Sequence, residues 1–169
     1  VASEVAKLHV LRVVNGAALI TNPGTGEILA MVGSKDYFNT EEDGNVNVTV
    51  ALRQPGSSIK PINYAVGLMK GYSAATIFVD RPTCFPSPGQ KPYCPVNYDR
   101  KYRGAVTMRQ ALGNSLNIPA VKMLKINTLE SFIATASAMG ITTFTDLSRY
   151  GLSLTLGGGE VKMTDMATA

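Results

Sequence analysis

The segment Arg53-Gln-Pro-Gly-Ser-Ser-Ile-Lys-Pro61 is the part of the sequence that most clearly predicts both a helix start and a pair of reactive residues. Pro55 and Gly56 interrupt regular structure, and apolar residues then recur at helical spacing, so a helix is expected to begin close to Ser57. On a helix, Ser57 and Lys60 lie one turn apart on the same face, close enough for the amine to take the hydroxyl proton. The alternative is a helix-capping Ser beside a solvated Lys, and the tetrapeptide alone favours that alternative.

The sequence offers few other partners that would activate a nucleophilic Ser. The single His, His9, lies close to the N-terminus and is expected to be an ordinary surface or edge residue. No Gly-x-Ser-x-Gly pattern occurs, so the sequence offers few residues from which a Ser-His-Asp triad could form. Lys60 is therefore the candidate base. A Lys acts as a base only when it is neutral, which requires desolvation or positive neighbours to lower its pKa.

A second polar pattern, Ser115-Leu-Asn117, follows a short helix that is predicted to be capped by Thr107 and to end at Leu112. Pro119 is expected to begin the next helix, so the pattern lies in a break between two helices. A loop in that position can aim a hydroxyl and an amide into a cleft. The alternative is an ordinary turn, because Ser and Asn are favoured in turns.

In the rest of the sequence, the residue patterns predict strands first and helices after, which indicates an α+β fold. Apolar runs over residues 17–21 and 27–32 flank Asn22-Pro-Gly-Thr-Gly26, a pattern that predicts a β-hairpin. The polar segment 34–47 is expected to be an exposed connection. Residues 80–104 hold five of the nine prolines and are predicted to form an irregular loop.

A further helix is predicted over residues 128–139. Asn127 followed three residues later by Glu130 matches a capping box, and Gly140 matches a C-terminal cap. The last residues, 166–169, continue a helical pattern, so we expect the ends of the chain to have been cut from something longer.

Composition narrows the class of protein. The 169 residues are 45% hydrophobic and 17% charged, which suits one globular domain or part of one. No apolar run approaches the roughly 18 residues of a membrane-spanning helix. The net charge is +4, but the basic residues are scattered, and the densest group is Lys101 and Arg103 beside Tyr102. A nucleic-acid surface needs a basic stripe with stacking aromatics, so no nucleic-acid partner is expected.

Two cysteines, Cys84 and Cys94, flank a proline-rich loop. A loop of this length can close into a disulfide, and an isolated pair without a nearby His is a poor metal site. Two free thiols in a cytosolic protein are the alternative. A bridge would place the chain in an oxidising compartment.

Four longer strings carry a resemblance to a known family. They are the segment 53–61 quoted above, Tyr102-Arg-Gly-Ala-Val-Thr-Met-Arg-Gln-Ala-Leu-Gly-Asn-Ser-Leu-Asn-Ile-Pro-Ala-Val121, Leu156-Gly-Gly-Gly-Glu-Val161 and Asn22-Pro-Gly-Thr-Gly-Glu-Ile-Leu-Ala-Met-Val-Gly33. Together with Ser-x-x-Lys and Ser-x-Asn, they resemble the transpeptidase domain of class A, bifunctional penicillin-binding proteins. The resemblance covers nearly the whole chain.

The family's third motif, a Lys followed by Thr or Ser and then Gly, is absent. In the family it lies on a strand downstream of the region where this chain ends. The resemblance therefore implies that residues 1–169 are the N-terminal part of a single transpeptidase domain, truncated before its C-terminal sheet strands. The implied fold is α+β, of the penicillin-binding protein transpeptidase and serine β-lactamase type, with the hairpin at about 17–33 and a mostly helical part at about 55–169.

The activity implied by the resemblance is peptidoglycan D,D-transpeptidation on stem peptides that end in D-Ala-D-Ala, without cofactor or metal. Ser57 would be the nucleophile, Lys60 its base, Ser115 a proton relay and Asn117 the residue that holds Lys60 and the substrate. β-Lactams would acylate Ser57. A β-lactamase, a β-lactam-binding sensor and an inactive fragment are the alternatives.

The family also implies a setting. Its members are membrane-anchored with their catalytic domains outside the cytoplasmic membrane, so an extracytoplasmic location is expected. The expected partners beyond the substrate are the missing C-terminal half of the domain and, in the parent protein, a glycosyltransferase domain. Without its neighbouring strands, the hairpin is expected to expose a sheet edge that invites pairing with another chain. The chain is therefore expected either to self-associate through the hairpin or to be one part of a nicked domain whose remainder stays bound.

Overall fold

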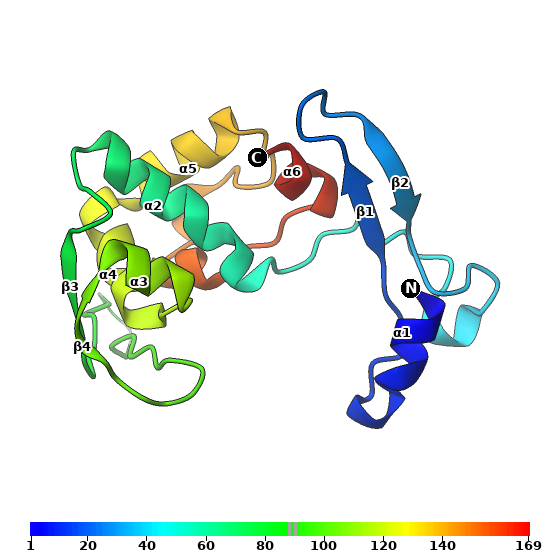
Figure 1. Ribbon diagram of the computed structural model, residues 1–169, viewed down its shortest axis with the longest axis horizontal. Helices are drawn as coiled ribbons and strands as arrows, with labels where there is room; N and C mark the ends of the chain where they lie inside the picture. The colour runs from blue at the N-terminus through cyan, green and yellow to red at the C-terminus, as the bar shows by residue number, and fades with distance from the viewer. Residues whose placement is uncertain (88, 90) are drawn as a thin grey trace. The chain divides into compact units, whose positions relative to one another are not determined.

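The computed structural model describes residues 1–87, 89 and 91–169 (Figure 1). The chain forms two compact units. The hairpin unit comprises Val1–Gln54, Met139–Thr143 and Glu160–Ala169, and the helical unit comprises Pro55–Ala138 and Phe144–Gly159. Among the described residues, no helix combines the length and the apolar character that crossing a bilayer would require.

The hairpin unit is built on two antiparallel strands, β1 and β2. Its elements are α1 (Ala2–Lys7), the 3-10 helix η1 (His9–Leu11), β1 (Ala18–Thr21), β2 (Ile28–Val32), the 3-10 helix η2 (Thr40–Glu42) and α6 (Met163–Thr168). In the strand register, Ala18 lies opposite Val32 and Ile20 opposite Ala30. The hairpin predicted from the sequence is therefore confirmed.

The turn of the hairpin explains why the chain reverses where it does. The Asn22 side chain accepts a hydrogen bond from the Gly24 N–H at 2.9 Å, and the Asn22 N–H donates to the Glu27 carbonyl at 2.8 Å. Asn is favoured in turns because its side chain can bond its own backbone two residues on. The register of the two strands therefore follows from local chemistry.

The helical unit contains the buried helices. Its elements are η3 (Gly56–Ile59), α2 (Lys60–Met69), β3 (Ile77–Asp80), β4 (Gly104–Thr107), α3 (Met108–Gly113), α4 (Asn117–Asn127), α5 (Leu129–Ala138), η4 (Leu147–Arg149) and η5 (Leu152–Leu156), where η marks a 3-10 helix. Helix α4 packs against α2 and η5, and Val121, Met123 and Leu124 on α4 have no exposed surface. A helix that is apolar on most sides is buried on most sides.

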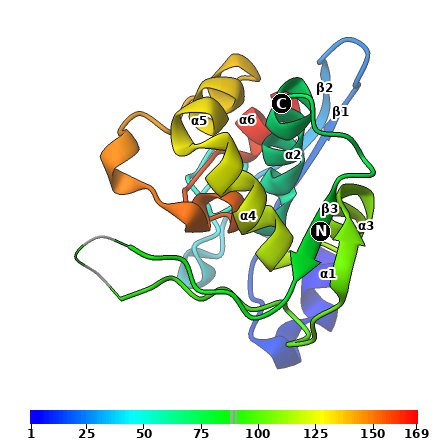
Figure 2. The same ribbon diagram turned by 90° about the vertical axis from the view of Figure 1, so that its left-hand side faces the viewer.

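Two short strands in the helical unit were not predicted. The segment 80–104 was expected to be irregular, but Asp80 ends β3 and Gly104 begins β4, and the two strands pair antiparallel (Figure 2). Within the connection, Phe85 and Tyr93 also pair across the disulfide loop. The prolines lie between these paired segments rather than within β3 or β4, and so the expectation was wrong only at its ends.

Helix boundaries were predicted with mixed success. The Thr107 hydroxyl accepts from the Gln110 N–H at 3.2 Å, which confirms the cap of α3. Helix α4 begins at Asn117, two residues before the proline expected to start it. The capping box expected at Asn127 is also wrong, because the Asn127 side chain donates to Asn63 and Thr128 is the residue that precedes α5.

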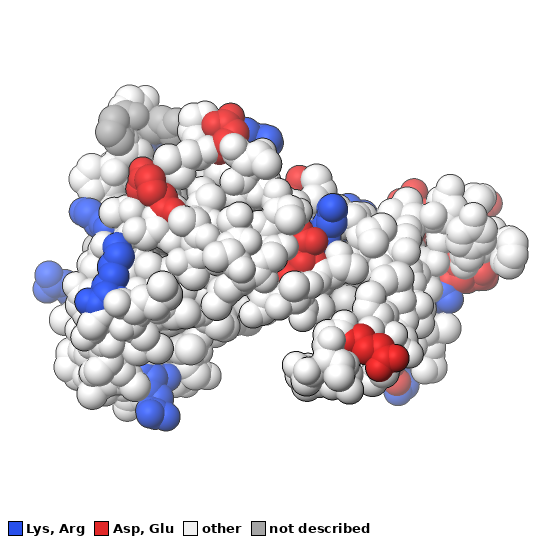
Figure 3. Space-filling model, turned by 90° about the horizontal axis from the view of Figure 1, so that it is seen from above, with Lys and Arg blue, Asp and Glu red and all other residues white. Residues whose placement is uncertain are grey.

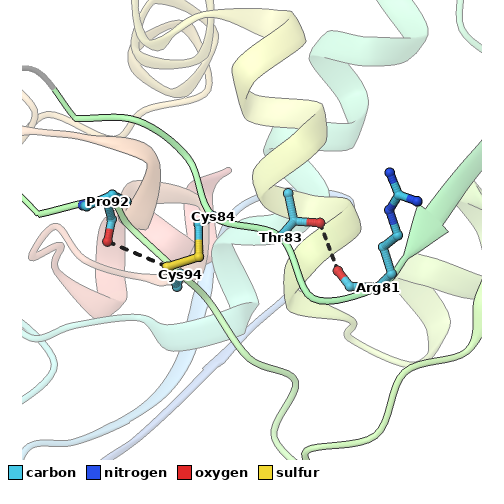
Figure 4. Close-up of a disulfide and its surroundings, with 5 residues drawn as sticks. All are labelled: Arg81, Thr83, Cys84, Pro92 and Cys94. Atoms are coloured by element: carbon cyan, nitrogen blue, oxygen red, sulfur yellow. Dashed lines mark hydrogen bonds between the residues drawn. A yellow bond between two sulfur atoms is a disulfide. The ribbon is translucent and has the colours of Figure 1, made fainter.

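Cys84 and Cys94 form a disulfide that closes the long loop between β3 and β4 (Figure 4). On the same loop the Thr83 hydroxyl donates to the Arg81 carbonyl at 2.8 Å, and the Cys94 sulfur lies 3.7 Å from the Pro92 carbonyl. The bridge expected from the spacing of the two cysteines is confirmed. It fixes one side of the segment that leads to Asn97.

Charged side chains are dispersed over the molecular surface shown in Figure 3, where acidic groups lie among basic ones and uncharged surface separates them. The densest basic group of the sequence does not stand alone either, because Arg103 is paired with Asp99 at 2.8 Å. On the face shown in Figure 3, basic side chains do not form a continuous stripe.

Candidate active site

Ser57 and Lys60 are brought together by one continuous helical segment. The 3-10 helix η3 holds Ser57 and runs directly into α2, whose first residue is Lys60. The two neighbouring serines differ in their surroundings. The Ser58 hydroxyl donates to the Pro55 carbonyl at 2.7 Å, whereas the Ser57 hydroxyl has no hydrogen-bond partner in the described part of the chain. Ser57 is exposed, and its hydroxyl is free to meet a substrate.

Lys60 is buried although it carries an amine. Its residue has 0% exposed surface, and its Nζ donates to the Ser115 carbonyl at 2.7 Å, the Ser115 hydroxyl at 3.1 Å and Asn117 Oδ1 at 2.7 Å. No carboxylate among the described residues pairs with it. Desolvation by burial therefore lowers the pKa of Lys60 to about 8, because neutral acceptors replace bulk water around the ammonium only in part.

The Ser115 and Asn117 side chains approach Lys60 from the junction between α3 and α4. Ser115 has a φ of +50°, a left-handed conformation that is uncommon for a residue with a Cβ. Asn117 is the first residue of α4, and its Nδ2 donates to the Val96 carbonyl at 2.7 Å. Asn117 therefore begins a packed helix, whereas Ser115 lies in the turn between α3 and α4.

A cavity of about 440 Å³ opens beside these groups. It is lined by Ser57, Asn97, Tyr98, Asp99, Arg103, Asn114, Ser115, Leu116 and Asn117. Three of the four residues singled out in the sequence thus line one cavity, and the fourth, Lys60, donates hydrogen bonds to two of them. The structure therefore brings the patterns at 57–60 and 115–117 together beside one cavity.

Close contact between two glycines brings η5 against the segment that holds Ser57. A Cβ on Gly157 would lie 2.3 Å from the Gly56 backbone nitrogen and 2.4 Å from the Gly56 Cα. Gly157 also has a φ of +89° and Gly56 a φ of +58°. Glycine is thus required at residue 157 by space as well as by conformation.

Several residues of the cavity wall were not predicted from the sequence. Asn97 and Asp99 were hidden inside the proline-rich loop, and Arg103 was noted only as a basic residue. Arg103 pairs with Asp99 at 2.8 Å, and this hydrogen bond is the main reason why the pKa of Asp99 is lowered. Their separation of four residues would suit an ion pair on a helix, but no local pattern links either residue to Ser57 or Ser115.

The chemistry available here is that of an exposed Ser57 hydroxyl in the cavity wall and a weakly basic Lys60 amine three residues later on the same helical segment. An amine with a pKa of about 8 is partly neutral near neutral pH, so it can accept a proton from a nearby alcohol. Within the described ranges, no group of three or more His, Cys, Asp or Glu side chains has the arrangement of a metal site. The arrangement supports acyl transfer through a serine.

Comparisons with known proteins agree with this geometry. Residues 16–157 match the family model described as the penicillin binding protein transpeptidase domain. Penicillin-binding protein 1A of Rickettsia felis is 35% identical over 166 residues, which cover 92% of this chain and 19% of that protein. Penicillin-binding protein 1A of Aquifex aeolicus is 35% identical over 156 residues, with 91% of this chain and 20% of that protein covered. The chain thus spans about a fifth of the length of these curated relatives.

Solved structures show the same fold. The crystal structure of penicillin-binding protein 1A from Haemophilus influenzae aligns with a TM-score of 0.78 and 30% identity, over 90% of this chain and 22% of that one. The PonA1 protein from Mycobacterium tuberculosis, solved in complex with penicillin V, aligns with a TM-score of 0.72 and 19% identity, over 97% of this chain and 45% of that one. The α+β transpeptidase fold predicted from the sequence is confirmed, and the chain belongs to the penicillin-binding protein transpeptidase domain family.

Proposed function

We propose that this chain supplies the nucleophile and the base of a peptidoglycan D,D-transpeptidase, with Ser57 and Lys60 in those roles. The observation that carries the proposal is the state of Lys60, which is buried without a carboxylate partner and has a pKa lowered to about 8. A structural Lys on a helix surface would keep its amine in water. A buried amine one helical turn after an exposed Ser suits a general base.

In the proposed acylation, the Ser57 Oγ attacks the carbonyl carbon of the penultimate D-Ala of a stem peptide. Neutral Lys60 takes the hydroxyl proton, and the C–O bond of the acyl-serine forms as the C–N bond to the terminal D-Ala breaks. The leaving amine needs a proton, which Ser115 relays, because its hydroxyl lies 3.1 Å from Lys60 Nζ. The Ser57 N–H is proposed as one donor to the developing oxyanion.

In the second half-reaction, the amine of a neighbouring stem attacks the acyl-serine. The new amide bond forms, the ester C–O bond breaks, and the proton lost by the amine returns to Ser57 through Lys60. Asn117 is proposed to keep Lys60 in place throughout, because its Oδ1 accepts from Lys60 Nζ at 2.7 Å. β-Lactams would acylate Ser57 by the same route, with opening of the lactam C–N bond.

The location proposed for this reaction is outside the cytoplasmic membrane. The Cys84–Cys94 disulfide supports this, since such bridges persist in oxidising compartments. The remaining active-site motif of the family, a membrane anchor and a glycosyltransferase domain are proposed for the natural protein that carries this chain.

A fluorescent penicillin tests the proposal in the full-length natural protein. We expect a stable label on wild type, loss of the label in Ser57→Ala, and retention of the label in the matched control Ser58→Ala. Labelling that survives in Ser57→Ala but not in Ser58→Ala would overturn the assignment. Rapid release of the label by hydrolysis would indicate a β-lactamase, and stable labelling without crosslinking of stem peptides would indicate a sensor.

The pH dependence of labelling tests the role of Lys60. Acylation requires the neutral amine, so its rate should rise with pH through about 8, the pKa of Lys60. In Lys60→Met, the rate should fall by about 10²-fold or more, the usual scale for loss of a general base. An unchanged rate in Lys60→Met would exclude Lys60 as the base.

A further inference from the structure

A buried carboxylate that the proposed reaction does not use lies behind the candidate site. Asp80, the last residue of β3, has 0% exposed surface. Its two oxygens accept from Asn97 Nδ2 at 3.0 and 2.9 Å, and Oδ2 also accepts from the Arg103 N–H at 2.9 Å. No Lys or Arg side chain in the described chain forms a salt bridge with it. Lys122 interacts with Asp80 electrostatically, but these hydrogen bonds to the buried carboxylate all come from neutral donors, so its position calls for a physical reason.

The carboxylate fixes which way the Asn97 amide faces. Asn97 is 2% exposed, and its Nδ2 donates to Asp80 and to the Lys101 carbonyl at 2.8 Å. Both partners are acceptors, so only the NH₂ end of the amide can face them. The Asn97 Oδ1 is thereby turned toward the Asn117 N–H, which donates to it at 2.8 Å. That N–H belongs to the first turn of α4, where a helix has no partner of its own.

The same logic applies one step nearer to the site. The Asn117 Nδ2 donates to the Val96 carbonyl at 2.7 Å, so its Oδ1 is left to accept from Lys60 Nζ at 2.7 Å. Val96 and Asn97 therefore hold Asn117 by its side chain and by its backbone. A reversed Asn117 amide would present two N–H donors to an ammonium, which has no acceptor to offer.

We propose that Asp80 and Asn97 are positioning residues for the Lys60 site, and that they act by setting the orientation of Asn117. The Asp80 carboxylate can only accept hydrogen bonds, so it fixes the direction of the Asn97 amide. Asn97 in turn holds the Asn117 N–H at the start of α4. The catalytic consequence rests on the proposed function of Ser57 and Lys60. The structural part, that Asp80 holds the Asn117 N–H through Asn97, does not.

An exchange of the two side chains tests the proposal in the full-length natural protein. Asp80→Asn places an NH₂ group against donors, and Asn97→Asp places a second carboxylate beside Asp80. We expect either change to slow acylation by a fluorescent penicillin about 10- to 100-fold, the scale of a misplacement of an ångström or less. Asp146→Asn is the matched control. It removes a carboxylate that bonds Ser148 outside the cavity lining, and it should leave the rate unchanged.

The double variant Asp80→Asn/Asn97→Asp restores most of the network with its polarity reversed. The amide at position 80 can accept from the Arg103 N–H and donate to the carboxylate at position 97, which still accepts from the Asn117 N–H. The bond to the Lys101 carbonyl and one of the two bonds between positions 80 and 97 are lost. The double variant should therefore acylate at least about fivefold faster than either single variant, as coupled residues in one network do. A double variant as slow as the two single effects multiplied would overturn the proposal.

The pH profile separates positioning from mere loss of stability. The groups that donate to or accept from Lys60 are neutral, and the charged side chains near Asp80 are those of Arg81 and Lys122. If Asn117 is no longer held in place, its Oδ1 no longer accepts from the Lys60 ammonium, which disfavours the charged form. The rising limb of acylation should therefore move to lower pH in Asp80→Asn and return in the double variant. A limb that stays in place in Asp80→Asn, after thermal unfolding has shown the variant to be folded, would also overturn the proposal.

Hydrogen exchange at the Asn117 amide decides the structural part without any activity. We expect this amide to exchange at least about 10-fold faster in Asp80→Asn than in wild type and to recover in the double variant, because its acceptor is lost and then restored. Unchanged exchange would refute the network. If wild type takes no penicillin label, the proposed function fails, and this measurement still decides what Asp80 and Asn97 do. If a single variant does not fold, recovery of folding in the double variant reports the same coupling.

Discussion

Helix α4 and strand β2 hold their apolar residues in opposite ways. Along α4, Val121, Met123 and Leu124 have no exposed surface, and the helix is packed by α2, α5 and η5. Along β2, every residue is exposed, and Leu29 keeps 59% of its surface in water. One element owes its place to burial within its own unit, whereas the other is held by its turn and by a single partner strand.

This difference shows where the precision of the candidate site comes from. Lys60 and Asn117 are the first residues of α2 and α4, and these two helices pack closely against each other. Side chains at the ends of packed helices are held in place because the helices themselves are held by the core. The hairpin contributes no residue to the cavity that Ser57 lines.

The largest expected effect comes from a substitution in the buried helix α4. Leu124→Ala removes a side chain with no exposed surface, and it should lower the free energy of unfolding by about 2 to 5 kcal/mol. The matched change Leu29→Ala on β2 should stay within about 0.5 kcal/mol. Urea denaturation measures both, and equal losses would show that β2 is as well packed as α4.

Removal of the disulfide should have the second-largest effect on the free energy of unfolding. Cys84→Ser/Cys94→Ser frees a loop with a sequence separation of 10 and should lower the free energy of unfolding by about 2 to 3 kcal/mol in the chain-entropy model. Denaturation with and without reductant checks this, because the reductant should have no effect on the variant. If reduction leaves wild type as stable as before, the loop is held by its other contacts.

A smaller effect concerns stability as a function of pH. The pKa of Lys60 is lowered in the folded state from 10.5 to about 8, so the unfolded chain binds its proton more tightly between these values. The contribution of Lys60 to stability should therefore rise as the pH increases from about 8 to about 10.5. The difference between wild type and Lys60→Met isolates this contribution from other titrating groups. A difference that is flat over this range would mean that the folded pKa is not lowered.

The smallest effect on stability is expected at the exposed strand. Leu29→Lys should change the free energy of unfolding by less than about 0.5 kcal/mol. It should nevertheless reduce self-association of residues 1–169, because a charge on an exposed apolar strand discourages pairing with another chain. Sedimentation velocity over a range of concentrations gives the answer, with Lys7→Glu on α1 as a surface control. Equal association of Leu29→Lys and wild type would exclude the hairpin as the contact.

The features that the sequence predicted correctly are those with a local cause. The hairpin follows from the turn at Asn22, and the start of α3 follows from Thr107 and Gln110 three residues later. The helical segment that joins Ser57 to Lys60 follows from one proline and one glycine. In each case the residues that decide the structure are close together in the chain.

The features that the sequence missed depend on distant partners. Strands β3 and β4 are four residues each and gain their order from pairing across more than twenty intervening residues. Asn127 was taken for a cap because of Glu130, but its amide is used by Asn63, 64 residues away. The bonds of Asn97 to Asp80 and Asn117, 17 and 20 residues away, leave no periodic trace in the sequence.

The contact between Gly56 and Gly157 limits how this protein can evolve. Any amino-acid replacement at residue 157 adds at least a Cβ, which would meet the Gly56 backbone at 2.3 Å, directly beside the serine at residue 57. Relief would require backbone movement directly before Ser57. Substitutions that reshape the cavity should therefore be tolerated at other residues of its wall before they are tolerated at residue 157.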